Sequence, residues 1–231
     1  MDNDRPYRHE LKYLINRRDM DSCMSRLREF ASYDDHIRDG KYMIRSLYYD
    51  DMYRSAYTEK ENGTGKRSKY RIRIYNMDEG FICLEKKIKD GSYIRKESAV
   101  LDRHEYDMII GGDTDHLLGR SESVANDFAA KWRMDMLRPE VIVDYDRVPL
   151  IYDHGNVRIT FDMNVRAVVG TTDIFDDKAP SYEVLGPDQL IMEVKYTEFL
   201  PDIFRAILPD GGCRLAMSKY VMCCDIKSKF S

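Results

Sequence analysis

The 231-residue sequence lacks several features that would place it in a familiar class. It has one tryptophan, and its five cysteines are scattered, odd in number and without metal-ligand spacing. It has no apolar run long enough to span a bilayer, and it does not open with a signal peptide. We therefore expect a cytoplasmic protein with reduced thiols and no transmembrane segment of its own.

The sequence also lacks an excess of positive charge. Its 37 Lys and Arg residues and 41 Asp and Glu residues give a formal net charge of -4. This balance argues against nucleic acid as a partner, because no bulk attraction to phosphates exists. The loop Asn62-Gly63-Thr64-Gly65 is too short for a glycine-rich phosphate loop. Any anion site must therefore be local and built from side chains.

The most informative segment present is Lys69–Tyr75, which alternates strictly. Positions 69, 71 and 73 are Lys, Arg and Arg, whereas positions 70, 72 and 74 are Tyr, Ile and Ile. This period of two predicts a strand with cations about 7 Å apart along one face. Such a row suits a polyanion. The alternative is a solvated sheet face whose charges discourage aggregation.

Other predicted strands repeat this division into a charged and an apolar face. They cover residues 8–15, 81–88, 93–98, 141–147, 157–164 and 190–196, with a further strand at 43–49. Amphipathic helices are predicted after Asn16, within 102–136 and from Ser218. If the apolar faces pack outward on helices, the charged faces line a barrel. We expect one α+β domain over residues 1–231, a closed antiparallel barrel of about eight strands with helices outside.

The interior of this barrel would be strongly basic. Its cations would be Lys12, Arg71, Arg73, Lys87, Arg147, Arg158 and Lys195, with one of Arg95 or Lys96. Its carboxylates would be Glu10, Glu85 and Glu193, with Asp162 as a further candidate. Like charges about 4 Å apart repel by about 4 kcal/mol at an effective dielectric of 20, so the cluster calls for a bound polyanion. Mixed Arg and Lys suit a chain of phosphates.

Simpler interpretations exist for some of these residues. Glu193 could form only an exposed ion pair with Lys195, worth about 0 to 1 kcal/mol. Tyr145 could only brace Arg147, and Asp162 could only orient Arg158. The five histidines have no convincing partner in the sequence, and we assign them no chemistry.

A set of short motifs runs in order from Arg8 to Tyr220. They are Arg8-x-Glu10-x-Lys12-Tyr13, Tyr70-Arg71-x-Arg73, Leu84-Glu85-Lys86-Lys87, Tyr145-x-Arg147, Val157-Arg158-x-x-x-Asp162, Glu193-Val194-Lys195 and Ser218-Lys219-Tyr220. In order and spacing the set resembles the VTC domain, the polyphosphate polymerase domain of the triphosphate tunnel metalloenzyme (CYTH-like) superfamily. Each motif alone is weak, but the ordered set is specific.

The resemblance implies a tunnel that holds triphosphate or polyphosphate, with ATP as the substrate of a polymerase. The implied lining residues are Lys12, Arg71, Arg73, Lys87, Arg147, Arg158 and Lys219, with Lys195, Lys96 or Arg95 as additions. Glu193 would be the principal ligand of Mn²⁺ or Mg²⁺. Glu10 and Glu85 could bind the metal directly or through water.

Two other functions stay open: a metal-dependent tripolyphosphatase, and a non-catalytic module that binds polyphosphate or inositol phosphates. The superfamily typically opens with Glu-x-Glu-x-Lys, whereas this chain has Arg8 at the first of these positions. Loss of that carboxylate removes a metal or water ligand and adds a cation, which favours the polymerase. Relatives of the yeast type add membrane spans, so coupling to export would need a membrane-protein partner.

Overall fold

The computed structural model describes residues 8–34, 37, 40–91, 93–197, 199–208, 213–214 and 218–230. The strands are β1 (His9–Asn16), β2 (Ser32–Tyr33), β3 (Tyr42–Asp50), β4 (Lys66–Tyr75), β5 (Ile82–Asp90), β6 (Tyr93–Leu101), β7 (Arg138–Tyr152), β8 (Val157–Val168), β9 (Ser181–Glu183), β10 (Gln189–Tyr196) and β11 (Cys213–Arg214). The helices are α1 (Arg17–Leu27), α2 (Ser55–Glu61), α3 (Arg103–Ile110), α4 (Ser123–Met134), α5 (Asp202–Arg205) and α6 (Lys219–Lys227), with a 3₁₀ turn, η1, at Asp115–Leu117.

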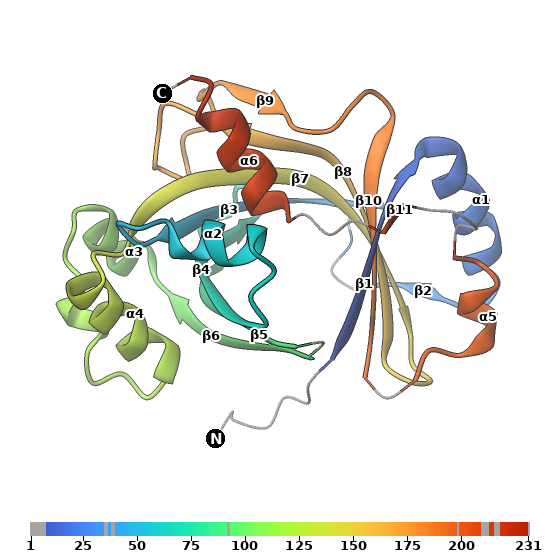
Figure 1. Ribbon diagram of the computed structural model, residues 1–231, viewed down its shortest axis with the longest axis horizontal. Helices are drawn as coiled ribbons and strands as arrows, with labels where there is room; N and C mark the ends of the chain where they lie inside the picture. The colour runs from blue at the N-terminus through green and yellow to red at the C-terminus, as the bar shows by residue number, and fades with distance from the viewer. Residues whose placement is uncertain are drawn as a thin grey trace.

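The strands form one antiparallel sheet in the order β11-β1-β10-β8-β7-β3-β4-β5-β6, and the short strands β2 and β9 pair with β7 and β8. The sheet curls until its ends approach one another (Figure 1). There the Arg8 N–H donates to the Ile94 carbonyl and the Ile94 N–H donates to the Arg8 carbonyl, both at 3.2 Å. The sequence predicted a closed barrel. Within the described residues the structure has a curved antiparallel sheet, and one isolated bridge joins its two sides.

The helices cover the outside of the sheet, as the alternation predicts. Ile72 and Ile74 of β4 are fully buried in a cluster with Tyr106 of α3 and Phe128 of α4. Figure 1 shows α3 and α4 on one side of the molecule and α1 and α5 on the opposite side. Each such fully buried apolar side chain contributes about 1.5 to 3 kcal/mol, so this packing holds the other strand face inward.

A second apolar cluster, under α1 and α5, fixes the opposite wall. Leu27 of α1 and Phe204 of α5 pack with Met192 of β10. Asn16 begins α1 with the predicted cap, since its side chain accepts a hydrogen bond from the Asp19 N–H at 2.9 Å. Because Met192 faces outward, Glu193 beside it in β10 faces the interior.

The extent of the strands differs from the sequence prediction. β4 begins at Lys66, three residues earlier than the predicted start at Lys69. Arg67 therefore joins the inward row of cations, because it has the same parity as Arg71 and Arg73. No helix in the described part of the chain combines the length and apolarity needed to cross a membrane.

Candidate functional site

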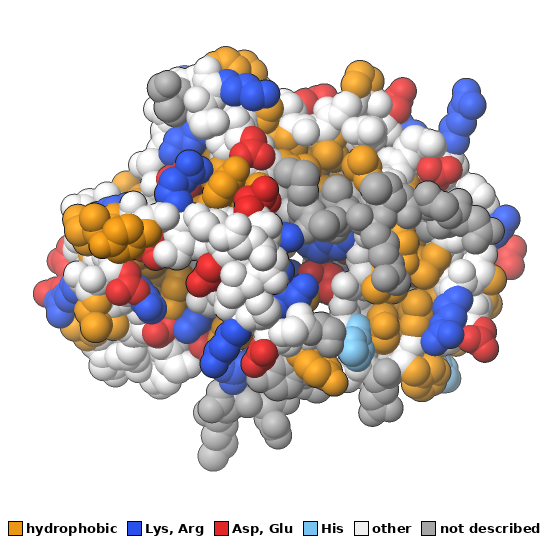
Figure 2. All heavy atoms as spheres, in the orientation of Figure 1, with side chains coloured by type: hydrophobic (Ala, Val, Ile, Leu, Met, Phe, Trp, Pro, Cys, Tyr) orange, Lys and Arg blue, Asp and Glu red, His pale blue; other side chains and the backbone are white. Residues whose placement is uncertain are grey.

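The interior of the sheet holds a cavity of about 700 Å³. Its lysine and arginine lining comprises Lys12, Lys60, Arg67, Lys69, Arg71, Arg73, Lys87, Lys89, Arg147, Lys195 and Lys219. Two carboxylates, Glu10 and Glu193, lie among these eleven cations. Figure 2 shows blue side chains around an opening near the centre of the face in view. A chain with a net charge of -4 thus concentrates positive charge in one place.

Strands β1 and β10 form an alternating square of charges. Lys12 pairs in register with Glu193, and Glu10 pairs with Lys195. The Lys12 ammonium lies 3.7 Å from Glu10 and 3.3 Å from Glu193, and that of Lys195 lies 3.5 Å and 2.9 Å from the same two carboxylates. Glu193 is only 4% exposed, so it does not form a mere surface pair with Lys195.

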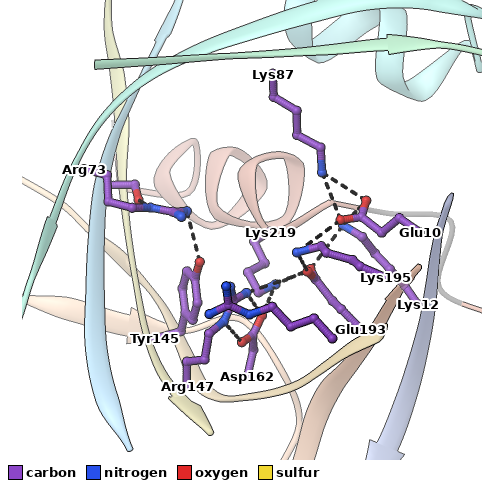
Figure 3. A network of polar contacts seen from close by, with 12 residues as sticks. Glu10, Lys12, Arg73, Lys87, Tyr145, Arg147, Asp162, Glu193, Lys195 and Lys219 are labelled. Atoms are coloured by element: carbon purple, nitrogen blue, oxygen red, sulfur yellow. Dashed lines mark hydrogen bonds and ion pairs between the residues drawn. The ribbon is translucent and has the colours of Figure 1, made fainter. Parts of the chain in front are cut away.

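Helix α6 brings a further cation to this network from outside the sheet. The Lys219 ammonium lies 2.8 Å from Glu193 and 2.5 Å from Asp162. Arg147 donates two hydrogen bonds to Asp162, at 2.6 Å and 2.7 Å. Asp162 therefore orients Arg147 and Lys219 and not, as the sequence suggested, Arg158. In Figure 3 the labelled side chains converge from β1, β4, β5, β7, β8, β10 and α6.

Tyr145 connects three of the cations. Its hydroxyl accepts a hydrogen bond from Arg73 at 3.1 Å. Its ring centre lies 5.2 Å from the Arg147 guanidinium and 4.9 Å from the Lys219 ammonium. The electron-rich ring face stabilises both charges, so Tyr145 does more than brace Arg147.

Glu85 lies beneath the cavity as a counter-ion and is not among the residues that line it. Its carboxylate is 2.6 Å from Arg71, 2.6 Å from Lys96 and 3.8 Å from Arg73. Burial alone would raise the pKa of Glu85, but Arg71 and Arg73 hold this pKa far below its usual range. To serve as a metal ligand, Glu85 would have to release these cations.

Two predicted lining residues, Arg158 and Arg95, lie away from the cavity. Arg158 donates to Asp34 at 2.7 Å and to the Tyr42 hydroxyl at 3.1 Å, outside the described lining of the cavity. Arg95 and Lys96 point to opposite faces of β6, because neighbouring strand residues alternate. Lys96 binds Glu85 on the inner side, whereas Arg95 pairs with Glu97 at 2.6 Å, which settles the choice left open. The structure thus corrects the placement of Arg158 and Arg95.

The carboxylates of the central network are held in their ionised form. Burial would raise the pKa of both carboxylates. Lys12, Lys87 and Lys195 instead hold the pKa of Glu10 well below its usual range, and Lys12, Lys195 and Lys219 do the same for Glu193. Burial would likewise lower the pKa of Lys219, yet Asp162 and Glu193 raise it. Glu10, Glu193 and Lys219 therefore keep their charges across the physiological pH range, whereas burial lowers the pKa of Lys87 to about 8.

Lys69 has a different environment. Its ammonium lies 3.3 Å from the Ser218 hydroxyl and 4.3 Å from the centre of the Tyr220 ring. Within the described residues it makes no salt bridge, and burial lowers its pKa to about 7. The sequence analysis did not include Lys69 among the expected lining residues, but it lines the cavity.

Besides Lys69, sequence reasoning missed three lining cations, Lys60, Arg67 and Lys89. Two of them carried a usable signal. Arg67 continues the alternation of Lys69 and Arg71 toward the start of the strand, and Lys89 continues that of Lys87 in β5. Lys60 lies at the end of α2, where no strand periodicity applies.

The donor set limits the kind of metal that the site can hold. No group of three or more His, Cys, Asp or Glu side chains lies close enough together in the described ranges to form a metal cluster. Glu10 and Glu193 flank the same two ammonium groups, those of Lys12 and Lys195. Two carboxylates suit a hard divalent cation that takes its other ligands from water and phosphate. The two carboxylates therefore fit a hard divalent cation such as Mg²⁺ or Mn²⁺ that takes most of its ligands from elsewhere.

Comparison with solved structures finds the same fold in other proteins. A candidate adenylate cyclase from Bacillus halodurans has a TM-score of 0.51 and 14% identity, covering 83% of this chain and 82% of that one. A candidate adenylyl cyclase from Hippeastrum, described with a dominant triphosphatase activity, has a TM-score of 0.46 and 11% identity, covering 88% and 84%. At 14% identity, the first of these shows similarity of fold alone.

Comparison with curated proteins finds no match. The comparison with protein families gives a match to the VTC domain over residues 7–227. This range contains every strand and helix of the structure and all the lining residues of the cavity. The chain therefore belongs to the VTC domain family.

Proposed function

We propose that the cavity binds a triphosphate or polyphosphate chain and that the protein is an ATP-dependent polyphosphate polymerase of the triphosphate tunnel superfamily. The observation that carries this proposal is the lining of eleven cations and two carboxylates around one cavity of about 700 Å³. Arginine forks grip phosphate oxygens in pairs, and lysines add mobile point charges. Membership of the VTC family supports the same substrate class. In this proposal the Arg8–Ile94 bridge closes the sheet into a tunnel.

The proposed reaction needs little from the protein beyond positioning and charge neutralisation. A terminal phosphate oxygen of the growing chain attacks the γ-phosphorus of ATP. A new P–O bond forms, the bond to the β,γ-bridging oxygen breaks, and ADP leaves with that electron pair. Because the attacking oxygen is already ionised near neutral pH, no general base is required. Arg71, Arg73 and Arg147 would align the chain for an in-line approach.

A divalent cation would complete the charge balance, with Glu193 and Glu10 as its protein ligands. When bound, it would neutralise charge on the transferred phosphoryl group and the leaving oxygen. The chain's own contribution is to keep both carboxylates ionised, Glu193 through Lys12, Lys195 and Lys219, and Glu10 through Lys12, Lys87 and Lys195. These lysines are also free to turn toward phosphate oxygens once the carboxylates find another partner.

The structure offers little support for a tripolyphosphatase. Hydrolysis needs a base that orients or deprotonates water, and a good base has a pKa near the working pH. The pKa values of Glu10 and Glu193 are instead held far below that range by lysines. Arg8, at the position of the superfamily's first carboxylate, is exposed and supplies no base in the described cavity.

The test is incubation with ATP and Mn²⁺ or Mg²⁺, following polyphosphate formation and, separately, phosphate release from tripolyphosphate. We expect polymer formation that is lost in Arg71→Ala and in Glu193→Ala. Arg103→Ala is a matched control, because Arg103 is a half-exposed cation on α3. Tight tripolyphosphate binding without turnover under either metal would contradict both enzyme functions and leave a phosphate-binding module.

A further inference from the structure

The β4–β5 hairpin carries two like-charged pairs next to each other. Lys69 lies opposite Lys87, and Arg67 lies opposite Lys89, whereas Arg71 lies opposite Glu85. Directly opposed side chains in an antiparallel pair are about 5 Å apart, so like charges destabilise the pairing. On this inner face Arg71 is compensated by Glu85 and Lys87 by Glu10. Lys69, Arg67 and Lys89 form no salt bridge within the described residues, so positive charge becomes uncompensated over four residues of β4, about 13 Å.

The end of this row is a cluster of three cations from three elements. Lys60 comes from α2, Arg67 from β4 and Lys89 from β5, and all three line the same cavity. Within the described parts of the chain none of the three forms a salt bridge. The Arg67 guanidinium donates a hydrogen bond to the Thr64 carbonyl, in the loop before β4.

The electrostatics of this cluster favour the binding of an anion. Burial and the cations Arg67 and Lys89 lower the pKa of Lys60, and burial and Arg67 lower that of Lys89. Glu59 acts on Arg67 from a distance, but no ion pair forms between them. The backbone of Gly63 and Gly91 also lines the cavity, and a Cβ there would meet no atom within 4 Å, so the space is open.

We propose that Lys60, Arg67 and Lys89 form a second subsite, at the mouth of the cavity, that binds the phosphates of a linear chain beyond those held in the central network. This subsite rests on the proposed binding of phosphate chains. It makes the preferred ligand a long linear polyphosphate and not a triphosphate alone. The row from Arg71 to Arg67 supplies a continuous path, since each inward residue lies about 7 Å from the next.

The test compares the affinity for tripolyphosphate with that for a longer polyphosphate of defined length, by calorimetry without metal. We expect the wild type to bind the longer chain more tightly. Arg67→Ala should lower affinity for the longer chain by roughly tenfold, as expected for loss of one charge-assisted hydrogen bond, and affect tripolyphosphate much less. Lys89→Ala should act in the same way.

Lys66→Ala is the matched control, because Lys66 is exposed, adjacent to Arg67 and absent from the described lining. It removes the same charge without touching the subsite. Equal losses for Lys66→Ala and Arg67→Ala, or equal losses on both ligands, would overturn the subsite while leaving phosphate binding intact. Failure of the wild type to bind tripolyphosphate would overturn the proposed function as well. Thermal melts of the variants show whether they fold, and Arg67→Gln provides a milder substitution.

Discussion

Glu85 is the residue on which the basic wall of the cavity most depends. It is 1% exposed and is the carboxylate shared by Arg71, Arg73 and Lys96. Removal of one partner from a buried ionic cluster typically costs about 3 to 5 kcal/mol. We therefore expect Glu85→Gln to lower the free energy of unfolding by about that amount in the absence of ligand.

This prediction is checked by urea denaturation with and without tripolyphosphate. The polyanion should restore more stability to Glu85→Gln than to the wild type, because it replaces the lost negative charge. Glu79→Gln is the control, since Glu79 is an exposed partner of Arg103. An unchanged stability of Glu85→Gln would show that the three cations do not need this carboxylate.

Lys69 predicts a pH dependence of ligand binding. Burial lowers its pKa to about 7, whereas an unfolded lysine titrates near 10.4. Between these values the unfolded chain carries the proton and the folded one does not, so this residue makes stability rise with pH in that window. A bound polyanion favours the charged form, so affinity should fall as pH rises above about 7.

The measurement is calorimetry at pH 8 in two buffers with different ionisation enthalpies. The wild type should take up more protons on binding tripolyphosphate than Lys69→Met, and the difference between the two removes the ligand's own titration. Equal proton uptake by both proteins would contradict a neutral Lys69 in the free protein. Asp50, Arg67, Lys12, Cys224 and Lys87 surround Lys69 and are unchanged in the variant.

Alternation in the sequence was enough to bring Arg71, Arg73 and Glu193 to the cavity, because strand parity fixes the face of every residue once one face is apolar. Parity does not determine where a strand begins and ends, or where along the interior of the sheet a residue lies. Arg158 illustrates the second limit, since it shares a strand face with Asp162 but is engaged by Asp34.

At the scale of elements, α6 supplies a cation that no strand pattern could predict. Lys219 was predicted to line the site only from the family resemblance, because a residue at a helix N-terminus gives no strand-like alternation in the sequence. Ser218 caps this helix by accepting a hydrogen bond from the Val221 N–H at 3.3 Å. The cap fixes the first turn, from which Lys219 reaches Glu193 and Asp162.

Ser218→Ala should therefore lower the free energy of unfolding by about 1 kcal/mol, as expected for loss of a helix cap. It should also weaken tripolyphosphate binding, since it loosens the turn that carries Lys219 and removes the hydroxyl near Lys69. Ser228→Ala, at the other end of α6, is the control. Equal binding by the two variants would show that the cap does not position Lys219.

The β4–β5 hairpin shows where the sequence prediction of strand bounds failed. The predicted strand began at Lys69, but β4 begins at Lys66. Arg67 keeps the parity of Lys69 and Arg71, but Lys66 and Ser68 are polar, so no apolar face marks the start of the strand and the predicted boundary fell three residues late. This shift concealed Arg67 and, through the register, its opposition to Lys89.

For the whole molecule, the division of apolar and charged faces predicted the layering of the fold. Outward residues such as Ile72 and Met192 pack on helices, and inward residues such as Arg73 and Glu193 line one interior. The bridge between Arg8 and Ile94 could not be predicted in the same way, because it joins two backbone groups whose pairing leaves no side-chain pattern.

A cavity with uncompensated charge should make the whole fold sensitive to its ligand. A ligand at 100 times its dissociation constant stabilises the folded state by about 2.7 kcal/mol. We expect tripolyphosphate to raise the melting temperature, and the increase to shrink with added NaCl because salt screens charges. The melting temperature without ligand at each NaCl concentration controls for general salt effects. An increase unaffected by salt would contradict an electrostatic site.

The most direct test of the central claim is the affinity for tripolyphosphate of the wild type, Arg73→Gln and the surface control Arg103→Gln, measured by calorimetry without metal. Arg73 is 6% exposed and lines the cavity, so its loss should weaken binding by roughly tenfold or more. The wild type and Arg103→Gln should bind alike. Equal binding by all three proteins, or no binding by the wild type, would contradict the assignment of this cavity to phosphate chains.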